Sequence, residues 1–283
     1  MSSAPASMAV LGGGRMGIGI AQVFAAAHAR VTIVESDPEQ ASAASERFDA
    51  ALARGVERGK VSDPEGIAGR VHYAHELERI PHDSELVVEA VPEDLDLKRR
   101  LLAAAEGVVS ERTVLATNTS ALPIAQLAEP LDRPGRFLGM HFFNPVPASA
   151  LVELVVGPST SDQARTLAQR WVEALDKTPI VVNDAPGFAT SRLGVALGLE
   201  AIRMLSDGVA SAEAIDTAME LGYRHRMGPL RLTDLVGLDV RLAVAEHLQA
   251  ELGERFAPPQ LLRDKVANGE LGRKTGQGFY AWP

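Results

Sequence analysis

Three glycines between an apolar run and a helical segment constrain the fold of this chain most. They are Gly12, Gly14 and Gly17, in the pattern G-x-G-x-x-G. The run before them, residues 8–11, predicts a buried strand, and the small apolar residues 16–29 predict a packed helix. Glycines in such a turn allow a tight bend, bring the backbone close to a ligand and let the helix pack against the sheet.

An acidic residue in the expected place makes the glycine pattern specific. Residues 31–34 predict a second buried strand, which ends on Glu35. A strand, a glycine turn, a helix, a second strand and an acid about 20 residues on are typical of dinucleotide binding. The start of the helix would offer unpaired N–H groups and its positive dipole end to the pyrophosphate. The turn residues expected to bind the dinucleotide are Gly12, Gly14, Arg15, Met16 and Gly17.

Composition excludes several other classes of protein. The net charge of −9, with no basic block, argues against a nucleic-acid surface, which needs clustered Lys and Arg. The absence of cysteine excludes disulfides, zinc–thiolate sites and a Cys nucleophile, and it fits a cytoplasmic protein. Residues 1–7 predict a frayed tail and no signal peptide. No apolar run approaches the ~20 residues of a membrane span, so no membrane partner is expected.

The first part of the chain alternates short β-branched runs with helical patterns. This βαβ rhythm predicts an α/β fold, with a mostly parallel, doubly wound Rossmann-type sheet over residues 1–184. The strands expected after the first two are residues 71–73, 86–88, 114–116, 137–139, 151–156 and 180–182. The helices expected between them are residues 40–58, 95–109 and 164–175.

After Asp184 the β pattern disappears, which predicts a smaller all-α domain over residues 185–283. Pro186 is placed to begin a helix at its first turn. The expected helices are residues 186–206, 212–221, 228–252 and 259–267. In the first of them, Gly194, Ala196 and Gly198 interrupt larger residues. That small-residue face suits either packing within the domain or a subunit interface.

Three polar features follow or interrupt predicted strands. Residues 117–120 follow one strand, His141 follows another, and Glu153 lies inside the apolar run 151–156. Ligands of open α/β sheets lie outside the carboxyl ends of the strands. A lone carboxylate in an apolar run costs several kcal/mol to bury unless it is paired. His141 is the obvious partner, since a carboxylate sets the tautomer and basicity of a histidine.

Each feature also has a structural interpretation. Ser120 could cap a short helix at residues 123–128. His141 could be a hydrogen-bonded core histidine, and Glu153 could be an edge-strand charge facing water. Asn144-Pro145 is also a plain turn signal. His72 and His75 lack acidic ligands nearby, so we expect them to be exposed and expect no metal site.

A glycine-rich, basic segment lies near the end of the chain, at residues 272–280. It lacks the spacing and the strand–helix setting of a phosphate-binding loop. The structural interpretation is a terminal turn held by Phe279, Tyr280 and Trp282.

Taken together, the motifs identify a family. The chain resembles the short-chain L-3-hydroxyacyl-CoA dehydrogenases, including bacterial 3-hydroxybutyryl-CoA dehydrogenases, over essentially its whole length. The matching segments are residues 12–19, 89–93, 118–120, 141–145, 184–188, 227–230 and 272–280. The resemblance implies an NAD-dependent enzyme that interconverts (S)-3-hydroxyacyl-CoA and 3-ketoacyl-CoA with a short acyl chain, such as 3-hydroxybutyryl-CoA.

The resemblance also implies roles for individual residues. His141 would be the general base, Glu153 its partner, and Ser120 a hydrogen-bonding group for the substrate oxygen. Glu35 would bind the adenosine ribose and favour NAD over NADP. The other residues implied in cofactor binding are Glu93, Lys98, Ser120, Asn144 and Lys274. Acyl-CoA would be the substrate, and the chain would form a homodimer through its helical domain.

Two positions depart from the family pattern. Ser191 stands where the family usually has Asn near the substrate, and Arg226 stands where Pro is expected. Ser191 keeps open an enzyme for another 3-hydroxy acid, either a free acid or an acyl-carrier-protein thioester. A non-catalytic dinucleotide-binding protein is a further alternative, and the set Ser120, His141 and Glu153 argues against it.

Overall fold

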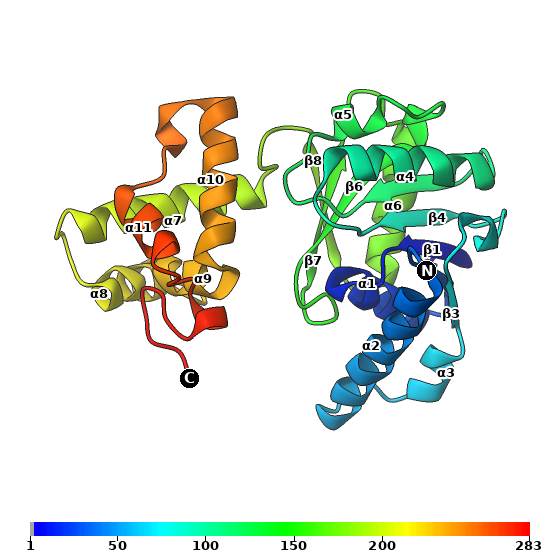
Figure 1. The fold of residues 1–283 in the computed structure, drawn as a ribbon, viewed down its shortest axis with the longest axis horizontal. Helices are drawn as coiled ribbons and strands as arrows, with labels where there is room; N and C mark the ends of the chain where they lie inside the picture. Colours follow the sequence, from blue (N-terminus) through cyan, green and yellow to red (C-terminus); the bar gives the residue numbers. More distant parts are fainter. Residues whose placement is uncertain (1–2) are drawn as a thin grey trace. The chain divides into compact units, whose positions relative to one another are not determined.

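The computed structural model describes residues 3–283, and the chain divides into two compact units between Asp184 and Ala185. The first unit is an α/β sandwich and the second is helical (Figure 1). No helix within residues 3–283 has the length and apolar character needed to cross a membrane.

The first unit is built on one sheet of eight strands. The strand order is β3-β2-β1-β4-β5-β6-β7-β8, so the direction of winding reverses between β1 and β4. Only the β6–β7 pair is antiparallel among the strand pairs of the described chain. The bounds are β1 (Ser7–Leu11), β2 (Arg30–Val34), β3 (Val71–Ala74), β4 (Leu86–Glu89), β5 (Val114–Thr117), β6 (Phe137–Phe142), β7 (Leu151–Val156) and β8 (Thr178–Asn183). The predicted mostly parallel, doubly wound sheet is confirmed.

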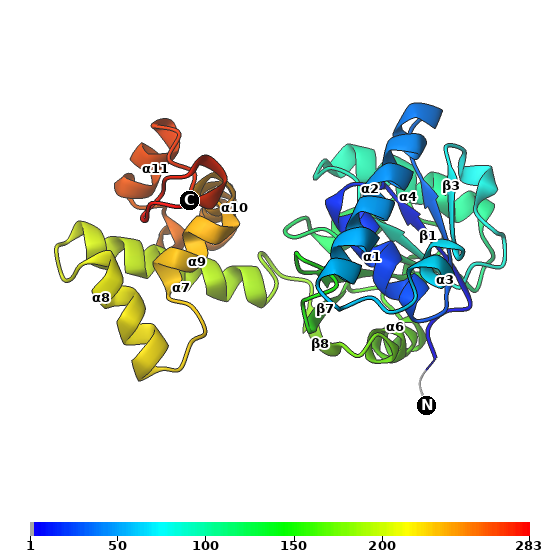
Figure 2. The same ribbon diagram turned by 90° about the horizontal axis from the view of Figure 1, so that it is seen from below.

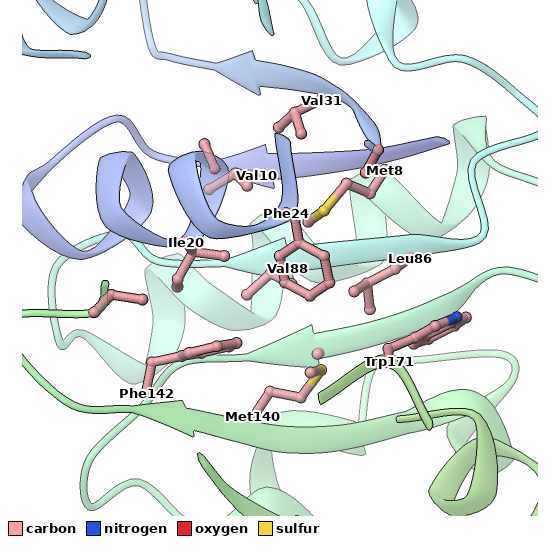
Figure 3. Close-up of a cluster of buried hydrophobic side chains, with 14 of the residues drawn as sticks. Met8, Val10, Ile20, Phe24, Val31, Leu86, Val88, Met140, Phe142 and Trp171 are labelled. Carbon is pink, nitrogen blue, oxygen red and sulfur yellow. The ribbon is translucent and has the colours of Figure 1, made fainter. Parts of the chain in front are cut away.

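Helices cover both faces of this sheet. In Figure 1, α4 lies above the sheet and α1 and α2 lie below it. Phe24 of α1 and Trp171 of α6 belong to one buried cluster with strand residues Met8, Val88 and Met140 (Figure 3). The bounds are α1 (Arg15–Ala26), α2 (Pro38–Glu57), α3 (Pro64–Ala68), α4 (Leu95–Val108), α5 (Ile124–Ala128) and α6 (Asp162–Ala174).

The second unit has its own core of leucine-rich helices. Leu199, Leu230, Leu238, Leu248 and Leu262 are buried there together. The bounds are α7 (Thr190–Ser206), α8 (Ala212–Thr217), α9 (Pro229–Val236), α10 (Leu238–Leu252) and α11 (Gln260–Ala267). Figure 2 shows these helices from a second direction, with α7 as the longest element of the unit.

Two predicted helix boundaries are wrong. The helix expected over residues 228–252 is two helices, because Gly237 has a φ of +110° and breaks the ladder between α9 and α10. The helix expected to begin at Pro186 begins at Thr190. Gly187 and Phe188, with φ of +71° and +50°, form a left-handed turn before it that Pro186 alone does not reveal.

The small-residue face of α7 is used inside the second unit. A Cβ built on Gly198 would lie 3.1 Å from the Thr233 hydroxyl, and one on Gly194 would lie 3.2 Å from the Arg241 guanidinium. These glycines therefore let α9 and α10 approach α7, which is the packing interpretation. Ala196 is exposed.

Two buried aspartates tie the second unit together. Asp234 accepts hydrogen bonds from the backbone N–H groups of Phe279 (2.8 Å) and Tyr280 (2.9 Å) and from the indole of Trp282 (2.8 Å). Asp216 accepts from the backbone of Leu230 (2.8 Å) and from the Tyr280 hydroxyl (2.7 Å). Burial and the Asp216 carboxylate raise the pKa of Tyr280. The terminal turn is thus held by its aromatic residues, as expected.

Candidate active site

The glycine turn is shaped by two positions where a side chain has no room. Gly12 has a φ of +98°, and a Cβ there would lie 3.0 Å from the carbonyl oxygen of Ala90. A Cβ on Gly17 would lie 1.8 Å from the carbonyl oxygen of Gly12. The first position brings the turn after β1 close to the loop after β4, and the second presses α1 against the turn. Both positions accept only glycine.

The beginning of α1 remains open, as a phosphate site requires. Gly14 is the N-cap, and no side chain caps the helix. A Cβ on Gly14 would meet nothing within 4 Å among the described residues. The first-turn N–H groups lie at the point where the strand order reverses, which is where ligands bind in such sheets. This cradle fits the pyrophosphate of a dinucleotide.

Glu35 lies directly after β2 and is bound to the glycine turn. Its Oε1 accepts a hydrogen bond from the Gly13 N–H at 2.8 Å. Arg47 of α2 lies 3.4 Å from the same oxygen and donates from Nε to the Gly13 carbonyl oxygen at 3.0 Å. The sequence analysis did not identify Arg47. Its position in the third turn of α2 carries no motif, and only the packing of α2 on the glycine turn reveals it.

A buried ion pair lies at the end of β4. Lys98 of α4 is 1% exposed, and its ammonium lies 2.7 Å from Glu89, which is fully buried. The other Glu89 oxygen accepts from the Thr117 hydroxyl at 2.6 Å. Each partner compensates the other's loss of hydration. Glu89 and Thr117 were not predicted as site residues.

The same ammonium reaches a second carboxylate that lies closer to the surface. Lys98 lies 3.2 Å from Glu93, whose side chain is 42% exposed. Glu93 also accepts from the Thr119 hydroxyl at 2.6 Å and from the Ser120 N–H at 3.0 Å. The loops after β4 and β5 are therefore joined. Ser120 does not cap α5, whose N-cap is Pro123, so the capping interpretation is wrong.

His141 and Glu153 face each other across the antiparallel β6–β7 pair. They are directly paired in register, and His141 Nδ1 lies 3.0 Å from Glu153 Oε2. His141 is 5% exposed and Glu153 is fully buried. Since an ionised carboxylate only accepts, Nδ1 carries the hydrogen, and the lone pair is on Nε2. Glu153 lies on an interior strand, so the interpretation of a charge facing water is wrong.

The loop after β6 is fastened by a buried lysine. The Lys177 ammonium donates to the carbonyl oxygens of Val146 (2.8 Å) and Ser149 (2.5 Å). Burial lowers the pKa of Lys177. Asn144 lies in this loop, next to Phe143, whose ring centroid lies 4.5 Å from that of His141. The loop that carries Asn144 is thus held beside His141.

The remaining predicted residues lie in the second unit. Ser191 is in the first turn of α7. Lys274 forms an ion pair with Asp239 at 2.5 Å. Arg226 is exposed in the segment before α9, and nothing in the structure explains its replacement of Pro. His72 and His75 are exposed, as expected.

The first unit therefore combines an open phosphate cradle with a histidine that can take a proton. Its strands end in a row in which Leu11, Glu89 and Thr117 are in register. The glycine turn, Glu93, Ser120 and the loop of Asn144 all follow strands at this edge. Such an arrangement suits oxidation of an alcohol, which needs a hydride acceptor and a base.

Two family models match the chain, one for each unit. Residues 7–185 match the 3-hydroxyacyl-CoA dehydrogenase, NAD binding domain, and residues 187–282 match the 3-hydroxyacyl-CoA dehydrogenase, C-terminal domain. The chain belongs to the 3-hydroxyacyl-CoA dehydrogenase family, and NAD is its cofactor.

Individual relatives match over nearly the whole chain. A probable 3-hydroxybutyryl-CoA dehydrogenase of Deinococcus radiodurans is 42% identical, over 96% of this chain and 99% of its own. A 3-hydroxybutyryl-CoA dehydrogenase of Mycobacterium tuberculosis is 40% identical over 100% of both chains. The crystal structure of (S)-3-hydroxybutyryl-CoA dehydrogenase from Ralstonia eutropha is similar with a TM-score of 0.93, at 37% identity, covering 99% of this chain and 100% of that one. The resemblance in the sequence analysis is confirmed.

Proposed function

We propose that this enzyme oxidises short-chain (S)-3-hydroxyacyl-CoA, such as 3-hydroxybutyryl-CoA, and reduces the matching 3-ketoacyl-CoA. The observation that carries the proposal is the buried His141–Glu153 pair near the carboxyl edge of the sheet. Relatives that are named 3-hydroxybutyryl-CoA dehydrogenases, at about 40% identity over the whole length, support the short acyl chain.

His141 manages the proton of the reacting alcohol. Its Nε2 takes the hydroxyl proton during oxidation and returns it during reduction, because Nδ1 is engaged with Glu153. Glu153 stabilises the imidazolium that forms and fixes the orientation of the ring. NAD supplies the hydride acceptor when it is bound. Ser120 donates a hydrogen bond to the substrate oxygen from the neighbouring loop.

Cofactor binding is assigned to residues along the carboxyl edge of the sheet. The turn residues Gly12, Gly14, Arg15, Met16 and Gly17 cradle the pyrophosphate, and Glu35 accepts from the adenosine ribose hydroxyls. Two residues position the nicotinamide end of the cofactor. They are Glu93, which Lys98 holds, and Asn144, which lies in the loop after β6 that Lys177 fastens. We retain Lys274 as a cofactor contact from the second unit on the resemblance alone.

Ser191 and the rest of the second unit are assigned to the substrate. A serine in place of Asn offers one hydroxyl on a shorter stem, and one ordered water can bridge the missing reach. We therefore keep the acyl-CoA assignment over a free 3-hydroxy acid or an acyl-carrier-protein thioester.

We also propose that the chain forms a homodimer through the helical unit and works in the cytoplasm. Within the described residues, this unit exposes several large apolar side chains, a common property of subunit interfaces. They are Leu193, Val209, Leu221, Tyr223, Val236 and Val240. Light scattering should give twice the chain mass of 30.1 kDa, and a mass near that of one chain would contradict the dimer. The absence of cysteine fits a reducing compartment such as the cytoplasm, and cell fractionation tests this assignment.

Formation of NADH tests the main proposal directly. Purified enzyme is given NAD with (S)-3-hydroxybutyryl-CoA, the free acid or the acyl-carrier-protein thioester, and NADH absorbance is followed. The CoA ester should give the highest kcat/KM. A higher value for either of the other two would move the function to another hydroxy acid, and no turnover with any of them would support a non-catalytic protein.

A further inference from the structure

Both polar groups of Gly13 are bound by one ion pair. The Gly13 N–H donates to Glu35 Oε1 at 2.8 Å, and the Gly13 carbonyl oxygen accepts from Arg47 Nε at 3.0 Å. The Arg47 guanidinium also lies 3.4 Å from the same Glu35 oxygen. These three residues form a closed set of contacts, called here the Arg47 clamp.

The Arg47 clamp lies where the adenosine end of a dinucleotide would bind. Gly13 is in the turn between β1 and α1, and Glu35 follows β2, which is the usual place of the acid that contacts the ribose. The Glu35 side chain is 15% exposed and that of Arg47 is 42% exposed. The guanidinium therefore borders solvent while its Nε stays anchored to the backbone.

We propose that Arg47 is a specificity-determining residue for the cofactor, in addition to Glu35. While Glu35 is present, it neutralises Arg47 and keeps the site selective for NAD. When a neutral residue replaces Glu35, Arg47 becomes a binding group for the 2′-phosphate of NADP. The proposal rests on the assignment of NAD to this edge of the sheet.

The geometry explains why Arg47 is neutralised beside Glu35 and why it can bind a phosphate when Glu35 is replaced. With Glu35 ionised, its carboxylate repels a 2′-phosphate, and the charge of Arg47 is cancelled by its partner. With a neutral residue at position 35, the Nε bond to the Gly13 carbonyl oxygen still holds the guanidinium in place. The two terminal nitrogens can then pair with phosphate oxygens side by side, which is the geometry that Arg favours.

A double-mutant cycle on binding tests the proposal without relying on turnover. The dissociation constants of NADH and NADPH are measured by fluorescence titration for the wild type, E35Q, R47A and E35Q/R47A. The matched control is R54A, alone and with E35Q. Arg54 lies two helical turns further along α2 and is exposed, so its removal changes the net charge equally without touching the clamp.

We expect E35Q to bind NADPH about tenfold or more tightly than the wild type, because a like charge is removed and a cation is released. R47A should cancel most of that gain in the E35Q background, while R54A should leave it within about twofold. Equal NADPH affinity of E35Q and E35Q/R47A would overturn the proposal. If E35Q lacks a cooperative thermal transition, E35S takes its place in the cycle.

The same titrations separate this inference from the proposed function. Wild-type protein that fails to bind NADH would contradict the assignment of the cofactor site itself. Wild-type protein that binds NADH, together with a cycle that shows no coupling between positions 35 and 47, would contradict only the role of Arg47.

Discussion

Buried carboxylates occur in both units of this enzyme, and their partners differ. In the first unit, Glu153 faces the His141 imidazole and Glu89 faces the Lys98 ammonium, while Glu106 accepts from two backbone N–H groups. In the second unit, the donors to Asp216 and Asp234 are backbone N–H groups and the neutral side chains Tyr280 and Trp282.

The difference separates a chemical role from a structural one. A carboxylate that faces a side chain able to gain or lose a proton can assist a reaction, since the charge of its partner can change. A carboxylate that faces backbone N–H groups has partners of fixed charge and can only hold the chain. Substitution of Glu153 should therefore affect turnover, and substitution of Asp216 or Asp234 should affect stability.

The largest effect is expected for H141A. Removal of a general base lowers kcat by about 10²- to 10⁴-fold, while NADH binding changes little. Stopped-flow or steady-state kinetics with 3-hydroxybutyryl-CoA measure this loss. H75A, at an exposed histidine, is the control and should keep wild-type turnover. If H141A retains most of its activity, the general base is another residue. The contrast between catalytic and structural carboxylates would then be wrong for the His141–Glu153 pair.

E153Q should come next, with a loss in kcat of about tenfold to 10²-fold. The amide still accepts the hydrogen bond from Nδ1 but no longer stabilises the imidazolium, so the acid limb of the pH–rate profile moves to lower pH. The thermal midpoint should stay close to that of the wild type, because a buried charge is removed and the shape is kept. E173Q, at an exposed glutamate of α6, is the matched control. A large loss of stability with unchanged kcat would show that Glu153 stabilises the fold and does not assist the reaction.

D234N is expected to show the opposite pattern. Three donors converge on this carboxylate, and an amide offers one acceptor oxygen and adds a donor. Hydrogen bonds to a charged group are strong, so the free energy of unfolding should fall by about 2–3 kcal/mol. Chemical denaturation measures it, with D264N, at an exposed residue of α11, as the control. The kcat of the folded fraction should be unchanged, and a lost kcat at intact stability would contradict the structural role.

The smallest effect is expected at Ser191. One neutral hydrogen bond contributes about 0.5–1.5 kcal/mol, so S191N should change kcat/KM on acetoacetyl-CoA by no more than about tenfold, in either direction. S191A should lower it by a similar amount. A thousandfold gain in S191N would mean that the chain is adapted to another substrate, and it would favour the hydroxy acid alternative.

The parts predicted well from sequence are those that local patterns specify. The apolar runs predicted every strand of the sheet, because strands buried on both faces read as continuous β-branched segments. The apolar run around Glu153 predicted a buried carboxylate, and the nearby His141 predicted its partner, which the structure places at 3.0 Å. The catalytic roles of these residues stay predictions until they are measured.

The parts missed depend on contacts between distant segments. Arg47 has no local signal, because a charged residue on α2 reads as a solvated helix face. The two helices α9 and α10 read as one, since Gly237 is tolerated in a helical pattern and only its φ of +110° shows the break. The Lys98–Glu89 pair joins a helix to a strand across nine residues, at a spacing that no periodicity marks.

The reversed direction of β7 makes this enzyme intolerant of small changes in the length of that strand. Because β7 runs against β6, Glu153 reaches His141 through a short connection, and their pairing is set by strand register alone. Side chains alternate between the two faces of a strand, so one residue inserted between Leu151 and Glu153 would turn the carboxylate to the opposite face. Natural variation in length should therefore fall in the loop before Leu151, and β7 itself should keep a fixed count of residues.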